Sequence, residues 1–323
     1  MEVKIIMLGI LALIGFLAGK TGYLPEIAGV MLSRVVIKIT APILIWITLA
    51  GNKFTSEEIR NGIWVYVFGF VFIMISYLIG TGVCSRLNLE KSTKSVYKMN
   101  FMFGNVVFLA FPLIGSVFGE THVKLALAYA VFFNLANDTI LWTLGIYLVN
   151  SHNGGRWKDN LKHLINGNTI AFSLGIICII FNLQNAVEHN TMVKAVYDVV
   201  YGTLKPLGDT TFPLSMLFIG LILAETKIQN TNDLLKRYPS IILTIFKLLI
   251  IPIIAFFALK LTGNILPPMV KGIIVIQLAM PCGTIVPALA SQYESDYKFA
   301  TENVFFSTLF CIITLPFISG LVR

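Results

Sequence analysis

Apolar stretches of about 20 residues recur along this chain, and they constrain its fold more than any other feature. A helix needs about that length to cross a bilayer. Only 12% of the residues are charged, and the mean hydropathy is +0.82. Since hydrocarbon offers backbone amides no other partner, such segments must be helical. We therefore predict an all-α integral membrane protein with ten spans, at about 4–20, 28–50, 62–83, 95–118, 122–149, 169–186, 196–225, 239–262, 268–292 and 298–321.

In two of these segments, several residues that interrupt helices occur close together. Proline removes a backbone donor, and glycine permits unusual backbone angles. Interrupted membrane helices at matching places in two halves of a chain are typical of a transporter binding site. The ends of half-helices suit charged groups, because their N–H and C=O groups lack partners. We predict a substrate-binding site formed by Gly104, Asn105, Pro112, Pro281, Gly283, Thr284 and Pro287.

A polar stretch at 151–168 divides the chain into halves of five spans each, 1–150 and 169–323. The halves resemble each other. Offsets of 171, 173 and 175 residues relate Pro42 to Pro213, Val131 to Val304 and Pro112 to Pro287. Because five is odd, the second half enters the membrane from the opposite side. The pattern predicts two inverted five-helix repeats, a known arrangement in transporters.

Basic residues predict the orientation. Clusters at 86–98, 156–162 and 227–237 all fall on one side of the membrane, which the positive-inside rule makes the cytoplasmic side. Both termini are then outside the cell membrane, and 151–168 is a cytoplasmic loop. The net charge of +8 belongs to such loops, so no nucleic-acid partner is expected. The four cysteines and four histidines lack metal spacing, so we expect neither metal nor cofactor.

Ionisable groups inside the predicted spans indicate coupling. Asn134, Asn137 and Asp138 share one helix face, and a carboxylate at that depth costs several kcal/mol unless it is paired or protonated. The equivalent positions in the second half are Ser307, Phe310 and Cys311, so the polar face is not duplicated. We predict a proton or cation site here, with Gln277 as a further member. The alternative is that Asp138 is hydrogen-bonded between helices or reaches an interface.

Three further charged residues inside predicted spans are candidates for a specific role. Lys38 and Asp209 occupy equivalent positions in the two halves. They are predicted to form a structural ion pair, although Lys38 is also a candidate ligand for an anionic substrate. Lys247 lies in the eighth span, where its stem is long enough for the ammonium to reach an interface.

These segments resemble the auxin efflux carrier family. The similarity is carried by the Gly104-Asn105 run ending in Phe111-Pro112-Leu113, by 280–293 and by 307–316, and it extends over essentially the whole chain. The resemblance implies the fold of bile-acid symporters and sodium/proton antiporters. Helices 1, 2, 6 and 7 would form a scaffold that also makes homodimers, and helices 3–5 and 8–10 a moving transport domain. Broken helices 4 and 9 would cross at the substrate site. The short central loop is like that of bacterial malate permeases.

The function that follows is a secondary transporter in the cytoplasmic membrane, working by an elevator-type mechanism. Its substrate would be a small organic anion, either a malate-like carboxylate or an auxin-like weak acid. The alternative is a sodium-coupled symporter of the bile-acid type, with cations at Asn134, Asn137, Asp138 and Gln277. An enzyme is not expected, because HExxH, GxSxG and paired-aspartate motifs are missing. A ligand sensor would need a soluble output domain.

Overall fold

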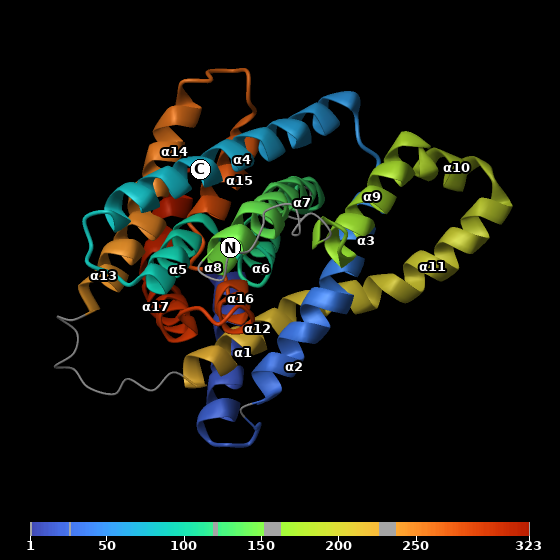
Figure 1. Ribbon diagram of the computed structural model, residues 1–323. Coiled ribbons are helices and arrows are strands. Elements are labelled where there is room, and N and C mark those ends of the chain that lie inside the picture. The colour runs from blue at the N-terminus through green and yellow to red at the C-terminus, as the bar shows by residue number, and fades with distance from the viewer. Residues whose placement is uncertain (1, 26, 119–121, 152–162, 226–236, 323) are drawn as a thin grey trace. The chain divides into compact units, whose positions relative to one another are not determined.

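The computed structural model describes residues 2–25, 27–118, 122–151, 163–225 and 237–322 (Figure 1). Within these ranges the regular structure is helical, apart from one isolated β-bridge. The basic clusters at 156–162 and 227–237 lie outside the described residues, apart from Arg237. The same is true of 152–162, which is most of the polar loop at 151–168. The predicted all-α class is confirmed.

Helices occupy each of the ten segments expected from the sequence. The first half contains α1 (Glu2–Lys20), α2 (Ile27–Val35), η1 (Val36–Thr40), α3 (Ala41–Ala50), α4 (Ser56–Cys84), α5 (Lys91–Met102), α6 (Ala110–Val117), α7 (Val123–Ile140), η2 (Leu141–Gly145) and α8 (Ile146–Asn150). The second half contains α9 (Gly167–Ile180), α10 (Leu183–His189), α11 (Thr191–Asp209), α12 (Thr211–Glu225), α13 (Tyr238–Ile245), η6 (Phe246–Ile250), α14 (Ile251–Lys260), α15 (Pro268–Leu278), α16 (Ile285–Gln292) and α17 (Tyr297–Leu321).

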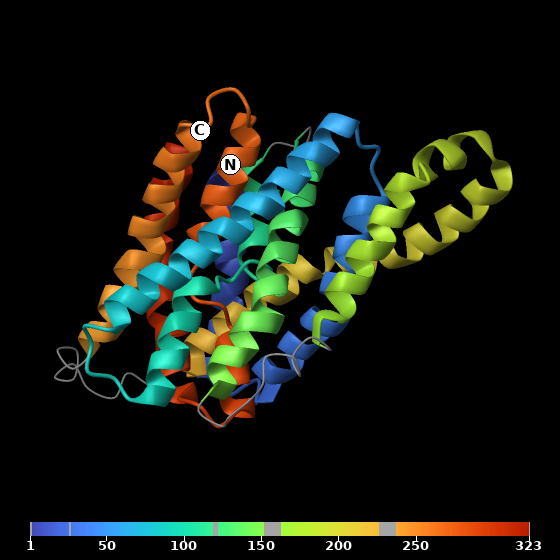
Figure 2. The ribbon, with the colours of Figure 1, turned by 45° about the horizontal axis from the view of Figure 1, so that its top comes forward.

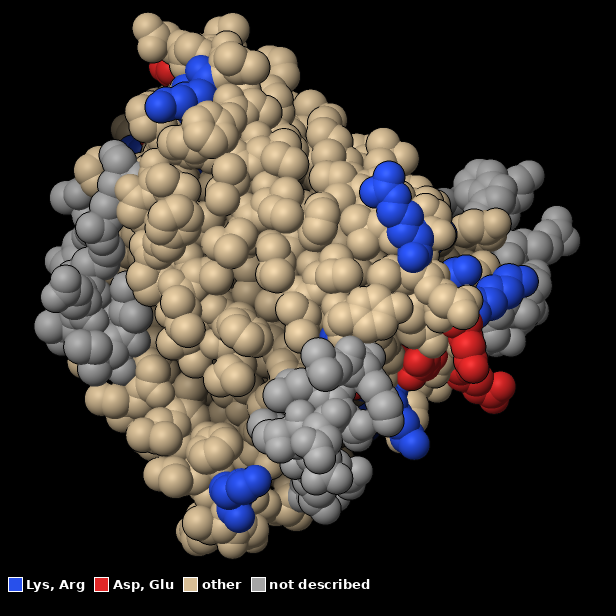
Figure 3. All heavy atoms as spheres, turned by 90° about the vertical axis from the view of Figure 1, so that its left-hand side faces the viewer, with Lys and Arg blue, Asp and Glu red and all other residues tan. Residues whose placement is uncertain are grey.

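Six helical spans in the described residues are long and apolar enough to cross a membrane, or seven if the bent pair of α9 and α10 is one span. The protein is therefore a multi-pass membrane protein. The two interrupted segments fall short because each is divided into half-helices of 8 to 12 residues. The face in Figure 3 has a broad area without charged residues, as contact with lipid requires, and the visible Lys, Arg, Asp and Glu lie around that area. Ten spans in two inverted repeats stay a prediction.

Prolines inside two spans are accommodated by π-helical turns. Pro42 and Pro252 are each the second residue after a five-residue π-helix, η1 and η6 respectively. A proline cannot donate to the carbonyl four residues earlier. The N–H of the preceding residue instead reaches back five residues, from Ala41 to Val36 and from Ile251 to Phe246. The register of side chains therefore changes at both places, and π-turns of this kind are frequent at functional sites.

The chain divides into two compact units, each built from separated segments. Unit 1 comprises 1–62, 107–135 and 165–225, and unit 2 comprises 63–106, 136–164 and 226–323. Predicted spans 1, 2, 6 and 7 all fall in unit 1, whereas predicted spans 4 and 5 are divided between the units. The expected separation into a scaffold and a moving domain stays a prediction.

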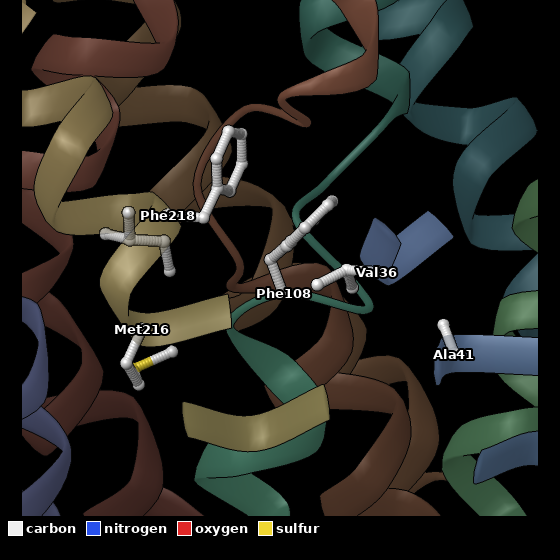
Figure 4. Close-up of a cluster of buried hydrophobic side chains, with 6 residues drawn as sticks. Val36, Ala41, Phe108, Met216 and Phe218 are labelled. Carbon is white, nitrogen blue, oxygen red and sulfur yellow. The ribbon is translucent and has the colours of Figure 1, made fainter. Parts of the chain in front are cut away.

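Unit 1 is held together by two helix pairings. α1 packs along α12, and α3 packs against α9 and α11 (Figure 1). Six buried residues form a hydrophobic cluster in this unit: Val36, Ala41, Phe108, Met216, Phe218 and Ile219. Figure 4 shows Phe108 between Phe218 and Val36, and the Phe108 and Phe218 ring centroids are 4.6 Å apart. Phe108 thus ties the loop before α6 to the core of this unit.

Unit 2 is organised around α17, which packs against α5, α13, η6, α15 and α16. Figure 2 shows the orange and red helices of this unit lying side by side. The four half-helix segments do not all belong here, because α6 is part of unit 1. Both interruptions nevertheless begin in unit 2, where α5 and α15 end, so their contacts can be described within it.

Candidate substrate site at the two helix breaks

The two interrupted spans have the same layout. The first break covers 103–109 between α5 and α6, and the second covers 279–284 between α15 and α16. Pro112 and Pro287 are each the third residue of the second half-helix. N–H groups of a first helical turn have no intrahelical partner, so a proline there loses no hydrogen bond. These two prolines therefore begin half-helices, and the interruption itself lies just before them.

The two breaks pair with each other through their backbones in unit 2. The Asn105 N–H donates to the Pro281 carbonyl at 2.8 Å. The Gly283 N–H donates to the Phe103 carbonyl at 3.0 Å. Four backbone groups freed by the unwinding thus satisfy one another, as buried groups must. Asn105 and Pro281 are both buried.

Glycines allow this close approach. Gly104 forms the isolated antiparallel bridge with Cys282. A Cβ on Gly104 would lie 3.2 Å from the Met280 Cβ, and one on Gly283 would lie 3.0 Å from the Gly104 carbonyl oxygen. Neither glycine has a positive φ. The expectation that they supply unusual backbone angles is therefore wrong, because what the site requires is the missing side chain.

Lys247 binds the carboxyl end of α5. Its Nζ donates to the carbonyl oxygens of Phe101 at 3.0 Å and Met102 at 3.2 Å. The side chain is 1% exposed. The expectation that Lys247 reaches an interface is wrong, because these carbonyls offer its ammonium partners inside unit 2. A cation at a helix C-terminus is favourable, since that end carries partial negative charge.

Helix α17 supports the second break. The Cys282 N–H donates to the Ser307 Oγ at 2.9 Å, and the Ser307 hydroxyl donates to the Asn303 carbonyl at 2.6 Å. The Cys282 thiol donates to the Asn100 carbonyl at 3.6 Å. The unwound peptide at Cys282 is therefore held from both α17 and α5.

Buried side-chain amides near these breaks lack partners among the described residues. Both amide atoms of Asn100 and of Gln277 make no hydrogen bond, although the residues are 0% and 1% exposed. The Asn303 Oδ1 is also unpartnered, while its Nδ2 donates to the Phe299 carbonyl. Buried polar groups are nearly always hydrogen-bonded, so unpartnered ones indicate a water or a ligand. Gln277 was predicted as a member of the proton or cation site, and that role stays a prediction.

The predicted coupling face of α7 is buried. Asn134, Asn137 and Asp138 are 2%, 4% and 6% exposed. Asn134 belongs to unit 1 and the other two to unit 2. The Asn137 Oδ1 has no hydrogen-bond partner among the described residues. The role of this face in coupling stays a prediction.

The remaining predicted residues are placed as follows. Thr284 is the N-cap residue of α16, but its side chain makes no capping hydrogen bond. Lys38 lies in η1 of unit 1 and is exposed. Asp209 forms an ion pair with Lys205 one turn earlier in α11, and no pair between Asp209 and Lys38 is found in the described residues. Asp209 therefore pairs with Lys205 on its own helix, and the predicted pair with Lys38 is wrong.

Sequence reasoning missed three residues of this site. Lys247 was noted only for its stem, and Asn100 and Ser307 were not selected as site residues. A usable signal was present for Asn100, because an amide in an apolar span four residues before Gly104 has no reason to be there in lipid. The partner of Lys247 could not be found this way, since it depends on contacts 145 and 146 residues apart.

Comparison with known proteins agrees with this architecture. The model of a family described as membrane transport protein matches residues 2–160 and 156–319. An uncharacterized transporter of Methanocaldococcus jannaschii is 26% identical over 319 residues, covering 98% of this chain and 96% of its own. One of Methanothermobacter thermautotrophicus is 24% identical over 315 residues, covering 95% and 93%. The chain is thus a membrane transporter. It belongs to the auxin efflux carrier family.

Proposed function

We propose that this transporter is a secondary carrier of small organic anions across the cytoplasmic membrane, with a malate-like carboxylate or an auxin-like weak acid as substrate. The observation that carries the proposal is the group of unpartnered, fully buried amides beside the paired breaks. Such groups are costly unless a ligand or a water satisfies them.

The chemistry of these groups fits a carboxylate. The amide nitrogens of Asn100 and Gln277 are donors, and their oxygens are acceptors. A carboxylate would accept from the nitrogens, and the hydroxyl of a hydroxy acid would donate to the oxygens. The ammonium of Lys247 in the same unit adds a positive charge that favours an anion.

We propose an elevator-type motion for the transport cycle. The division of the chain into two compact units supports it, because alternating access needs one body that moves against another. Proton coupling through Asp138 is part of the same proposal. Asp138 is buried, and an ionised carboxylate in such a place is costly. Alternate exposure to water on the two sides of the membrane would let it bind and release a proton.

The test is uptake of labelled malate and of an indole acid by purified protein in proteoliposomes, with and without sodium and at two pH values. Removing a hydrogen bond to a charged ligand costs about 1.5–3 kcal/mol. Asn100→Ala and Gln277→Ala should therefore raise the half-saturation concentration about 10- to 100-fold.

The matched control is Gln292→Ala, because Gln292 is exposed at the end of α16. It should transport like the unmodified protein. If no carboxylate or weak acid is taken up under any of these conditions, the proposal is wrong. If both amide variants keep the half-saturation concentration of the unmodified protein, the amides do not bind the substrate. Strict sodium dependence of uptake would favour the sodium-coupled alternative.

A further inference from the structure

We propose that the ammonium of Lys247 is a resident cation, which occupies the carbonyl end of the broken helix α5 in place of a metal ion. Unwound carbonyls and the C-terminal ends of half-helices bind sodium in other transporters with broken helices. Oxygens that Lys247 occupies cannot bind a coupling ion, and this consequence rests on the proposed function.

The geometry at the end of α5 is that of a cation site already filled. Nζ lies 3.0 and 3.2 Å from the oxygens of Phe101 and Met102, the last two residues of the helix. An ammonium has three donors and no acceptor, so it suits carbonyl oxygens. A charged group this deeply buried is retained only when such partners compensate for its lost hydration.

The other carbonyls at this end are also occupied. The Met99 oxygen accepts from the Phe103 N–H at 2.9 Å, and the Asn100 oxygen accepts from the Cys282 thiol. The Phe103 oxygen accepts from the Gly283 N–H. Each carbonyl from Met99 to Phe103 therefore has a donor, and Lys247 supplies two of the five.

Local backbone structure explains how a lysine can be placed here. Lys247 lies within the π-helical turn η6, just before Pro252. Lys38 lies within the corresponding turn η1, before Pro42, and is exposed. The π-turn alone thus does not bury a lysine. The acceptors at the end of α5 make the difference.

The test measures cation-dependent stability in the purified full-length protein, and needs no substrate. Thermal unfolding is followed in sodium, lithium or choline chloride at equal ionic strength. The unmodified protein should melt alike in sodium and choline. Lys247→Gln and Lys247→Met should melt about 2–8 °C lower in choline, because two buried carbonyls lose their donor. Sodium should restore part of that loss.

Two further variants sharpen the test. Lys247→Arg keeps the positive charge and should show no sodium response. Lys260→Gln removes an exposed lysine of the same span and should behave like the unmodified protein. The proposal is overturned if the neutral variants respond to sodium no more than Lys260→Gln does. It is also overturned if they cannot be recovered folded in either salt, because an ion site should be rescued by its ion. Failure to transport any anion would count against the proposed function alone.

Discussion

The two broken spans share their layout but differ in what fills the break. The offset of 175 residues that relates Pro112 to Pro287 also relates Phe108 to Gly283. Phe108 inserts a buried ring into the hydrophobic cluster of unit 1, against Phe218. Gly283 instead leaves room for a backbone, at the place where the two breaks pair. The packed ring of Phe108 anchors the first break, whereas the absence of a side chain at Gly283 allows the two breaks to come into contact.

The carboxyl ends of the two first half-helices differ as well. Lys247 and other donors occupy the end of α5. At the end of α15, the carbonyl oxygens of Leu278, Ala279 and Met280 accept no hydrogen bond from any residue that the structure describes. The two breaks therefore have similar backbone layouts, but the groups packed around each one determine whether its carbonyl oxygens have donors. A coupling cation would find free oxygens at the end of α15, whereas the carbonyls from Met99 to Phe103 at the end of α5 already have donors.

The largest effect is expected from Phe108→Ala. Truncating a buried phenylalanine costs about 3–5 kcal/mol, because it removes contacts and leaves a cavity. The control is Phe257→Ala, since Phe257 is 60% exposed on α14. Thermal unfolding of the purified protein should show a fall in melting temperature that is clearly larger for Phe108→Ala. Equal shifts would mean that Phe108 does not anchor the first break.

A smaller loss of stability is expected from Gly283→Ala, which adds a side chain where Phe108→Ala removes one. The added Cβ would lie 3.0 Å from the Gly104 carbonyl oxygen, so the two backbones would have to separate. Overpacking of this kind costs about 1–3 kcal/mol. It should also reduce uptake, because the pairing positions the amides.

Gly82→Ala is the control for that comparison, since a Cβ there meets nothing within 4 Å. Alanine favours a helix over glycine by about 1 kcal/mol, so this variant should be neutral or more stable. If Gly283→Ala matches Gly82→Ala in melting temperature and uptake, the close pairing of the breaks is not needed.

The sequence predicted the helical class, and each predicted segment contains helix, because the need to satisfy backbone groups in lipid leaves few choices. It also located both breaks from their glycines and prolines. It did not predict that Pro112 and Pro287 would begin half-helices. Nor could it show that Gly104 and Gly283 allow contact, because this depends on a segment 178 residues away.

The site was only partly predictable, for the same reason. Composition showed which polar residues lie in apolar spans, and Gln277 was selected in this way as a member of the coupling site. It could not tell which of them have partners. Lys247 was expected to reach an interface, but it is buried against α5. Asp209 was expected to pair with Lys38, but it pairs with Lys205. Long-range contacts decide these outcomes, and spacing along the chain does not record them.

The smallest effect on stability, and the most specific effect on transport, is expected from Asp138→Asn. The polar face of α7 has no duplicate in the second half, so it is the clearest chemical difference between the halves. Asparagine keeps the shape of Asp138 but cannot release a proton. Stability should change by only about 1 kcal/mol, the usual size for a conservative change.

Uptake by this variant in proteoliposomes should no longer respond to a pH gradient, although exchange of labelled for unlabelled substrate should continue. Asp198→Asn is the control, because Asp198 is exposed on α11, and it should keep the pH response of the unmodified protein. An unchanged pH response in Asp138→Asn would place proton coupling elsewhere. The difference between the halves would then reflect only how α7 packs, since a buried carboxylate that moves no proton must be held by a fixed partner.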